Sequence, residues 1–130
     1  MWKLFLMTFF IIVSTYSFAE WVVIEKNKNE GITRYVDIST IKKNKNKVRM
    51  VDLIDYKIKR KALDDKFLSI KIVQEYDCNN ARKRILTFNT YNGNMGKGGV
   101  IYRDTSPNEW TIIPSFNSTR FNLWEIACNK

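Results

Sequence analysis

The chain has 130 residues, with 22 lysines and arginines against 13 acidic residues and a formal net charge of +9. It contains no histidine, which excludes Ser–His and Cys–His catalysis, histidine-ligated metal and the commonest ligand of haem. Two cysteines without histidine make a poor zinc site, so we expect neither a metal nor a cofactor.

The N-terminus has the three parts of a secretory signal peptide. Lys3 provides a positive start, Leu4–Val13 is apolar, and Ser17-Phe18-Ala19 places small residues before a cut ahead of Glu20. The apolar run is shorter than the ~20 residues of a membrane-spanning helix, although an uncleaved anchor is the alternative. No cysteine lies near the cut, so lipid attachment is not expected. We predict residues 1–19 as a signal peptide and residues 20–130 as one domain.

Strand signals dominate this domain. β-branched and aromatic runs separated by turn residues predict strands, and short turns between consecutive strands favour antiparallel pairing. The predicted strands are Trp21–Ile24, Thr33–Asp37, Val48–Tyr56, Ser69–Cys78, Ala81–Tyr91, Val100–Arg103 and Trp110–Ile113. Between the second and third, Asp37–Ile41 is typical of one capped helical turn with Asp37 as the N-cap.

The alternation in Ser69–Cys78 assigns its side chains to two faces. Ile70, Ile72, Tyr76 and Cys78 share one face, which only Gln74 interrupts. The opposite face carries Lys71, Glu75 and Asp77, and we expect it to be solvated. Asn79-Asn80 then predicts a tight hairpin turn.

The C-terminal segment predicts a helix over Arg120–Cys128, capped by Ser118 or Thr119. Leu123, Trp124, Ala127 and Cys128 recur at helical spacing and would face the sheet. Since an exported chain meets an oxidising environment, Cys78 and Cys128 are expected to form a disulfide. The predicted fold is α+β, with a mainly antiparallel sheet of about six strands, the C-terminal helix packed on it and one disulfide.

Positive charge is concentrated in Lys42–Lys61. This stretch holds nine basic residues against Asp52 and Asp55, in two groups that flank one predicted strand and should lie at its opposite ends. They would suit anionic headgroups, cell-wall polymers, sulfated glycans or acidic proteins; the alternative is that these lysines only solubilise the protein and protect its edges. No nucleic-acid-binding motif is present. The candidate contact residues are Lys57, Lys59, Arg60 and Lys61, followed by Lys42, Lys43, Lys45 and Lys47.

No pattern of residues predicts an enzyme. Asp52 and Asp55 are three apart on a predicted strand and therefore point to opposite faces. Glu75 and Asp77 share a face, but beside Lys71 they are better explained as solvated charges. The three tryptophans of the domain lie in predicted strands or the helix, so we expect core packing for Trp21, Trp110 and Trp124.

Taken together, several segments resemble a known family. In order they are AEW, YVDIST, VRMVDLIDY, SIKIVQEYDC, RKRILTFNTYNGNMGKGGVIY, the Trp110–Pro114 element and LWEIAC. Their order, spacing and cysteines resemble the surface-adhesin protein E family of small exported bacterial proteins, over nearly all of the domain. The resemblance implies a mainly antiparallel sheet with a flanking helix, one disulfide and a non-enzymatic role in binding host matrix or plasma proteins. Haem binding is also associated with the family, but this chain has no histidine for it.

These observations predict a periplasmic or surface-associated binding protein that contacts an acidic partner through its basic residues. The partner would be a host matrix or plasma protein or an anionic polymer. One alternative is a periplasmic inhibitor of a hydrolase, whose targets would be acidic because like-charged partners repel. Others are an envelope protein without a specific ligand and an enzyme that works without histidine. The oligomeric state is not predicted.

Overall fold

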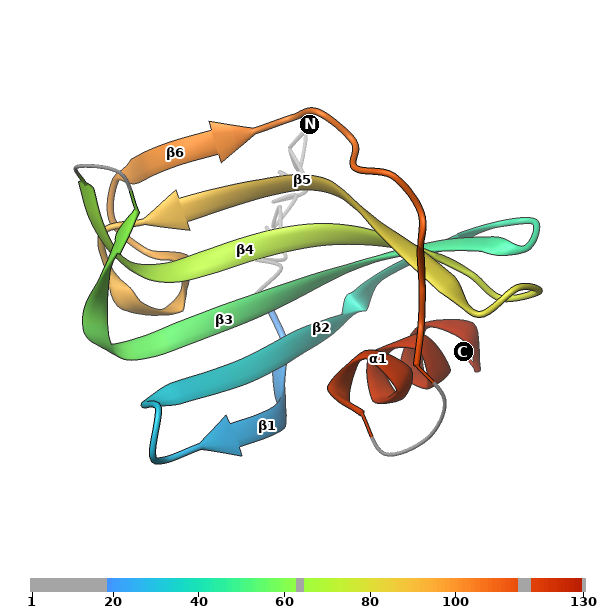
Figure 1. Ribbon diagram of the computed structural model, residues 1–130, viewed down its shortest axis with the longest axis horizontal. Helices are drawn as coiled ribbons and strands as arrows, with labels where there is room; N and C mark the ends of the chain where they lie inside the picture. Colours follow the sequence, from blue (N-terminus) through green and yellow to red (C-terminus); the bar gives the residue numbers. More distant parts are fainter. Residues whose placement is uncertain (1–18, 63–64, 115–117, 130) are drawn as a thin grey trace, which may run out of the picture.

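The computed structural model describes residues 19–62, 65–114 and 118–129. The expected signal peptide therefore lies outside the described residues, apart from Ala19. The described part forms a seven-stranded antiparallel sheet and one α-helix (Figure 1). The elements are β1 (Trp21–Asn27), β2 (Ile32–Asn44), β3 (Lys47–Ala62), β4 (Asp65–Asp77), β5 (Arg82–Tyr91), the 3₁₀ turn η1 (Asn94–Gly96), β6 (Val100–Asp104), β7 (Thr111–Ile112) and α1 (Thr119–Cys128).

Strands adjacent in the sequence are adjacent in the sheet, in the order β1-β2-β3-β4-β5-β6. β7 joins separately, because the outer edge of β5 has two partners in succession. β6 pairs with residues 88–91 of β5, whereas β7 pairs with Arg82 and Lys83 near its start. The segment between β6 and β7 thus runs from one end of the sheet to the other, and α1 is the next element after β7 (Figure 1).

The predicted α+β fold is confirmed, but two local predictions are wrong. Residues 37–41 form no helical turn, because β2 continues through them to Asn44. Asp37 does organise a local irregularity: its carboxylate accepts from the backbone N–H of Ser39, and the register with β3 shifts after it. Thr40 then accepts from the backbone N–H of Val51 at 2.9 Å. The bulge therefore keeps its hydrogen bonds within the sheet, which favours strand over helix.

The second correction concerns Lys57–Lys61, which was expected to lie between two strands. These residues belong to β3, and Lys61 lies opposite Lys66 of β4 after a register shift beyond Asp55. Lysine is a weak strand former. The pairing of Arg60 and Lys61 with β4 and the bond from Lys57 to Gly31, both tertiary interactions, therefore decide the conformation of this segment.

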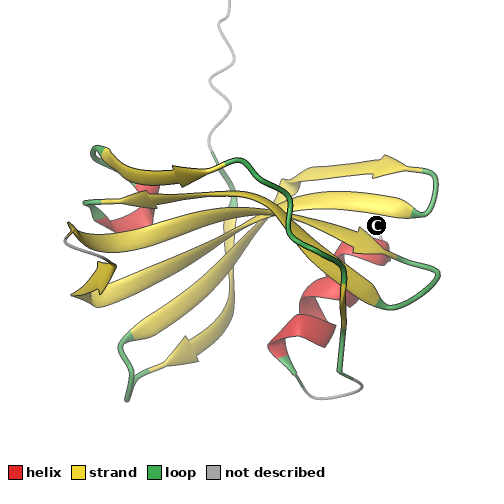
Figure 2. Ribbon diagram, turned by 45° about the horizontal axis from the view of Figure 1, so that its top comes forward, coloured by secondary structure: helices red, strands yellow, loops and turns green. Residues whose placement is uncertain are grey.

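Helix α1 packs on one face of the twisted sheet, near the end that carries the β2–β3 and β4–β5 turns (Figures 1 and 2). Ser118 caps the helix by accepting from the backbone N–H of Phe121 at 3.1 Å. Leu123 and Ala127 are buried, and Trp124 and Cys128 pack against the same core. The predicted facing of the helix is confirmed. The core consists of Val36, Val48, Met50, Tyr76, Ile113, Leu123 and Ala127.

The disulfide Cys78–Cys128 is confirmed and joins the end of β4 to the end of α1, with the two Cα atoms 5.6 Å apart. Within the described ranges, no helix combines the length and the apolarity needed to cross a bilayer.

Candidate functional site

The exposed lysines of β3 lie at the end of the sheet farthest from α1 (Figure 1). Lys57, Lys59 and Lys61 are all exposed. Their strand is held in place by the turn between β1 and β2, since the backbone N–H of Lys57 donates to the carbonyl of Gly31 at 2.8 Å. Gly31 has a φ of +64°, and a Cβ there would lie 3.2 Å from the Cβ of Lys57. Glycine therefore permits this close approach.

The same turn adds lysines that the sequence interpretation did not include. Lys26 and Lys28 line a cavity of about 580 Å³ together with Lys57. Lys66 lies opposite Lys61 on β4. We call this set the lysine-rich end: Lys26, Lys28, Lys57, Lys59, Lys61 and Lys66, all of which are exposed.

Arg60 differs from its lysine neighbours because its side chain is engaged within the protein. Its Nη2 donates to the carbonyl of Glu30 at 2.8 Å, and its guanidinium lies 5.1 Å from the ring centroid of Tyr56. The first contact ties β3 to the β1–β2 turn, and the second lies within β3. Arg60 therefore helps to build the lysine-rich end, although its exposed surface still adds to the positive charge.

The second group of basic residues is separate from the first. Lys42, Lys43 and Lys45 are exposed at the β2–β3 turn. At 3.3 Å per residue, the ten steps along β3 from Lys47 to Lys57 span about 33 Å. The two groups therefore lie at opposite ends of the sheet, as expected, and do not form one patch.

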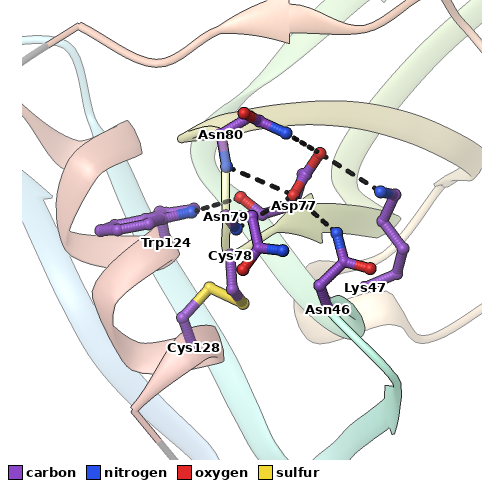
Figure 3. The surroundings of a disulfide bond; sticks show 8 residues. All are labelled: Asn46, Lys47, Asp77, Cys78, Asn79, Asn80, Trp124 and Cys128. Carbon is purple, nitrogen blue, oxygen red and sulfur yellow. Dashed lines mark hydrogen bonds and ion pairs between the residues drawn. A yellow bond between two sulfur atoms is a disulfide. The ribbon is translucent and has the colours of Figure 1, made fainter.

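Lys47 is held by Asp77, which is fully buried at the end of β4 (Figure 3). Burial raises the pKa of Asp77, but hydrogen bonds from Arg82, Asn80 and Lys47 outweigh that effect and hold it well below the usual range. The carbonyl of Asp77 also accepts from the indole N–H of Trp124 in α1 at 2.9 Å. The donors to its carboxylate come from Asn46, Lys47, Asn79, Asn80 and Arg82.

The expectation that Glu75 and Asp77 face solvent is therefore wrong. Glu75 is only 7% exposed and pairs with Arg84 at 2.8 Å and Arg49 at 3.5 Å. Arginine side chains lie over the carboxylates and provide hydrogen bonds that water would otherwise supply. Burial of an ion pair of this kind is invisible in a β-strand alternation, because the pattern shows which face a residue has but not what covers it.

Trp110 lies among cations rather than in the core. The charged groups of Lys47, Arg82 and Arg84 are 4.8–5.4 Å from the centroid of a Trp110 ring, and the side chain is half-buried. The expectation of core packing is confirmed for Trp124 and wrong for Trp110. Cation–π contact explains why an aromatic ring is stable between charged side chains.

A polar network lies on the face of the sheet that carries α1. Asp52 is 5% exposed, and both its carboxylate oxygens accept from the side-chain amide of Gln74, at 3.0 and 3.1 Å. The amide oxygen of Gln74 accepts from Nζ of Lys83 at 2.6 Å. Burial raises the pKa of Asp52 from 3.8 to about 6, although Gln74, Lys83 and Arg34 lower it in part. Gln74 therefore does more than interrupt an apolar face: it connects a buried acid to a base.

This network borders a cavity of about 550 Å³ between the sheet and the start of α1. Arg120 of α1 lies in its wall, and so do Arg34 and Glu25, which form an ion pair at 3.3 Å. Thr119 at the start of the helix donates to the same Glu25 carboxylate at 2.8 Å. We call this the polar cavity. It brings together side chains from β1, β2, β3, β4, β5 and α1.

The prediction that Asp52 and Asp55 point to opposite faces is supported by their partners. Asp55 accepts from the backbone N–H of Met95 at 2.8 Å and from the Asn94 side chain at 3.1 Å, both in η1. Asp52 instead joins the network below α1. The two carboxylates do not work as a pair, and their visible role is to organise neighbouring segments.

The sequence interpretation missed Lys26 and Lys28 because they precede the basic stretch and meet it only through the β1–β2 turn. It missed the polar cavity because that site needs residues from six elements. The one signal available was Gln74, a polar residue on an otherwise apolar strand face.

The chain was compared with known proteins by sequence and by structure. A model of the family described as "Surface-adhesin protein E" matches residues 21–129. No curated protein matches the sequence. Among solved structures, the selenomethionine form of Haemophilus influenzae protein E is similar, with 15% identity, a TM-score of 0.65, and coverage of 88% of this chain and 90% of that one. A second crystal form of protein E has 13% identity and a TM-score of 0.61, covering 85% of this chain and 97% of that one.

Proposed function

The chain belongs to the surface-adhesin protein E family, and from that premise we propose that it is an exported binding protein whose lysine-rich end contacts an acidic partner. Family membership identifies an adhesin-like protein and points to a non-enzymatic role. The finer part of the proposal rests on one observation: of six exposed lysines from three strands and a turn, Lys26, Lys28 and Lys57 line one cavity. Lys59 and Lys61 follow along β3, and Lys66 lies opposite Lys61.

The chemistry of this end favours a partner with many anionic groups. Each exposed lysine contributes a mobile point charge that attracts carboxylate or sulfate without requiring a fixed geometry. The cavity of about 580 Å³ beside Lys57 gives such a partner a concave place to dock. Acidic segments of host matrix or plasma proteins, and sulfated glycans bound to them, have the required charge.

Heparin, a sulfated glycan, is a suitable probe. We expect the variant Lys57→Glu/Lys59→Glu/Lys61→Glu to bind heparin at least about ten-fold more weakly, because charge reversal replaces attraction to the sulfates with repulsion. A ten-fold loss of affinity corresponds to about 1.4 kcal/mol. Binding by the unchanged protein should weaken steeply as salt is raised, since these charges are exposed and screened. Affinity would be measured by surface plasmon resonance at several salt concentrations. Arg60 is left unchanged because it is part of the local structure.

The matched control is Lys42→Glu/Lys43→Glu/Lys45→Glu, which changes the net charge by the same amount at the opposite end of the sheet. We expect it to retain most of the affinity. Equal losses in both variants would show that net charge alone binds heparin. Unchanged affinity in the first variant would remove the lysine-rich end as the contact surface.

We further propose that export uses the signal peptide at residues 1–19, so that the mature protein begins at Glu20. The short apolar segment and its small residues before Glu20 support this. Mass spectrometry of the protein recovered from the cell envelope would show the mature N-terminus. Protease treatment of intact cells would then separate a surface protein, which is degraded, from a periplasmic one, which is protected.

A further inference from the structure

The face of the sheet that carries α1 has a second cavity beyond the helix. This apolar cavity has a volume of about 370 Å³ and is lined by Phe67, Ile70, Phe88 and Tyr102, together with Asp65, Thr90 and Ile101. Phe88 and Tyr102 pack with their ring centroids 5.8 Å apart. Apolar walls of this kind suit an apolar ligand.

One polar atom in the wall of the apolar cavity has no partner. Thr90 is 4% exposed, and its hydroxyl has no hydrogen-bond partner within the described part of the chain. A buried hydroxyl without a partner is unfavourable, because it loses its hydrogen bonds to water without replacement. Thr90 lies opposite Ile70 on one side and Tyr102 on the other. A ligand in this cavity would cover the hydroxyl and could bond to it.

The apolar cavity and the polar cavity are neighbours on one face. Ile72 lines the polar cavity, Phe88 lines the apolar cavity, and the two residues are opposite each other on β4 and β5. Gln74 lines the polar cavity and Ile70 lines the apolar cavity. The distance between them along β4 is four residues, or about 13 Å. One elongated molecule can therefore reach both cavities.

Cations outnumber acids in the wall of the polar cavity. Its charged residues are Arg34, Lys83 and Arg120 against Glu25 and Asp52. Glu25 is already paired with Arg34. Burial lowers the pKa of Lys83; Asp52 raises it, and Arg120 and Arg34 lower it further by repulsion. An anion placed between Lys83 and Arg120 would relieve that repulsion.

We propose that the two cavities together bind one single-chain carboxylate amphiphile, a free fatty acid, with its carboxylate near Lys83 and Arg120 and its chain between Ile70, Phe88 and Tyr102. The adjacent positive and apolar walls match the two parts of such a molecule. A free chain fits better than a bilayer surface, because Phe67 and Ile72 are at most 9% exposed and face inward. The lysines proposed to contact the acidic partner line a different cavity, beside Lys57, although Lys66 lies between Asp65 and Phe67 of the apolar cavity on β4.

The first test uses the unmodified protein and sodium dodecanoate, below its micelle concentration, in isothermal titration calorimetry. One molecule should bind per chain. From octanoate to dodecanoate the affinity should rise up to about four-fold per buried methylene. Dodecyltrimethylammonium, with the same chain and a positive head, should bind at least about ten-fold more weakly because it meets Lys83 and Arg120. Amide NMR shifts should locate the bound chain near Ile70, Phe88 and Thr90.

Two variants at exposed positions test the two parts of the site. Arg120→Glu should weaken dodecanoate binding about ten-fold, whereas Lys42→Glu, the same charge change outside both cavities, should leave it unchanged. Tyr102→Ala should weaken binding and flatten the dependence on chain length. Circular dichroism would confirm that each variant is folded.

Several results would overturn the proposal. One is equal binding of the cationic and anionic chains; another is an affinity that does not depend on chain length. NMR shifts confined to the lysine-rich end would assign dodecanoate to the other surface. Binding to phosphatidylglycerol vesicles without binding of dodecanoate would identify a membrane surface instead of a free chain.

Discussion

At the scale of single residues, Asp52 and Asp77 are two buried carboxylates whose pKa values are shifted in opposite directions. Both are at most 5% exposed. Asp77 accepts hydrogen bonds from five neighbouring residues, so its pKa is held well below the usual range. Within the described part of the chain, the side chain that donates to the carboxylate of Asp52 is that of Gln74, and burial dominates its pKa. Hydrogen-bond donors outweigh burial at Asp77 and do not outweigh it at Asp52.

Asp77 should therefore be important for stability. We expect Asp77→Asn to lower the free energy of unfolding by about 3 kcal/mol at pH 7, because it leaves Lys47 and Arg82 without their buried counter-charge. Urea denaturation would measure the change. Glu109→Gln is the control, since Glu109 is exposed and should change stability by no more than about 0.5 kcal/mol. A similar, small effect for both substitutions would contradict the assignment of Asp77 as the centre of this end of the sheet.

Asp52 should make the free energy of unfolding decrease as pH rises. Its pKa is raised from 3.8 to about 6, so the folded state holds a proton that the unfolded state has lost between these values. Its contribution is fully present below pH 3.8 and is lost as pH rises through 6, by up to about 3 kcal/mol. Asp52→Asn should remove this component, and urea denaturation of both proteins at pH 4.5 and 7.5 would show it. Parallel pH profiles for the two proteins would contradict the prediction.

At the scale of elements, the position of α1 depends on contacts made far along the chain. The helix is attached by the disulfide to Cys78, by Trp124 to the carbonyl of Asp77, and by burial of Leu123 and Ala127. Its hydrophobic residues predicted which side faces the sheet. Where on the sheet it lies follows from the pairing of β7 with the start of β5, which brings the chain to that end just before the helix begins.

Removing the disulfide should loosen this element before the rest of the fold. The two cysteines are 50 residues apart, and loop-closure entropy for that separation gives a loss of roughly 4 kcal/mol in Cys78→Ala/Cys128→Ala. Hydrogen exchange should accelerate more for the amides of α1 than for those of β3 and β4. Uniform acceleration across the sheet and the helix would show instead that the disulfide stabilises the whole domain equally.

At the scale of the whole molecule, the sheet separates three kinds of surface. The lysine-rich end and the lysines of the β2–β3 turn lie at opposite ends, and the polar and apolar cavities lie on the face shared with α1. The two groups of lysines lie about 33 Å apart along β3. At physiological salt, the charge of a partner bound at one end is therefore screened from the lysines at the other end. This separation makes the lysines of the β2–β3 turn a matched control for the lysine-rich end.

The sequence by itself determined the α+β class, the antiparallel order of strands, the capped terminal helix and the cysteine pair. These follow from local periodicity, turn residues and capping, which act over a few neighbouring positions. It also located the lysines of residues 42–61, because charge is a property of composition.

Only the tertiary structure decided which of these residues act together. Lys57 lies in β3 and bonds to Gly31 of the β1–β2 turn, and Lys26 reaches it through that turn. Burial of Glu75, Asp77 and Asp52 depended on arginines from neighbouring strands and on the helix α1. Such contacts are set by which segments pack across the sheet, and no periodicity within one strand records them.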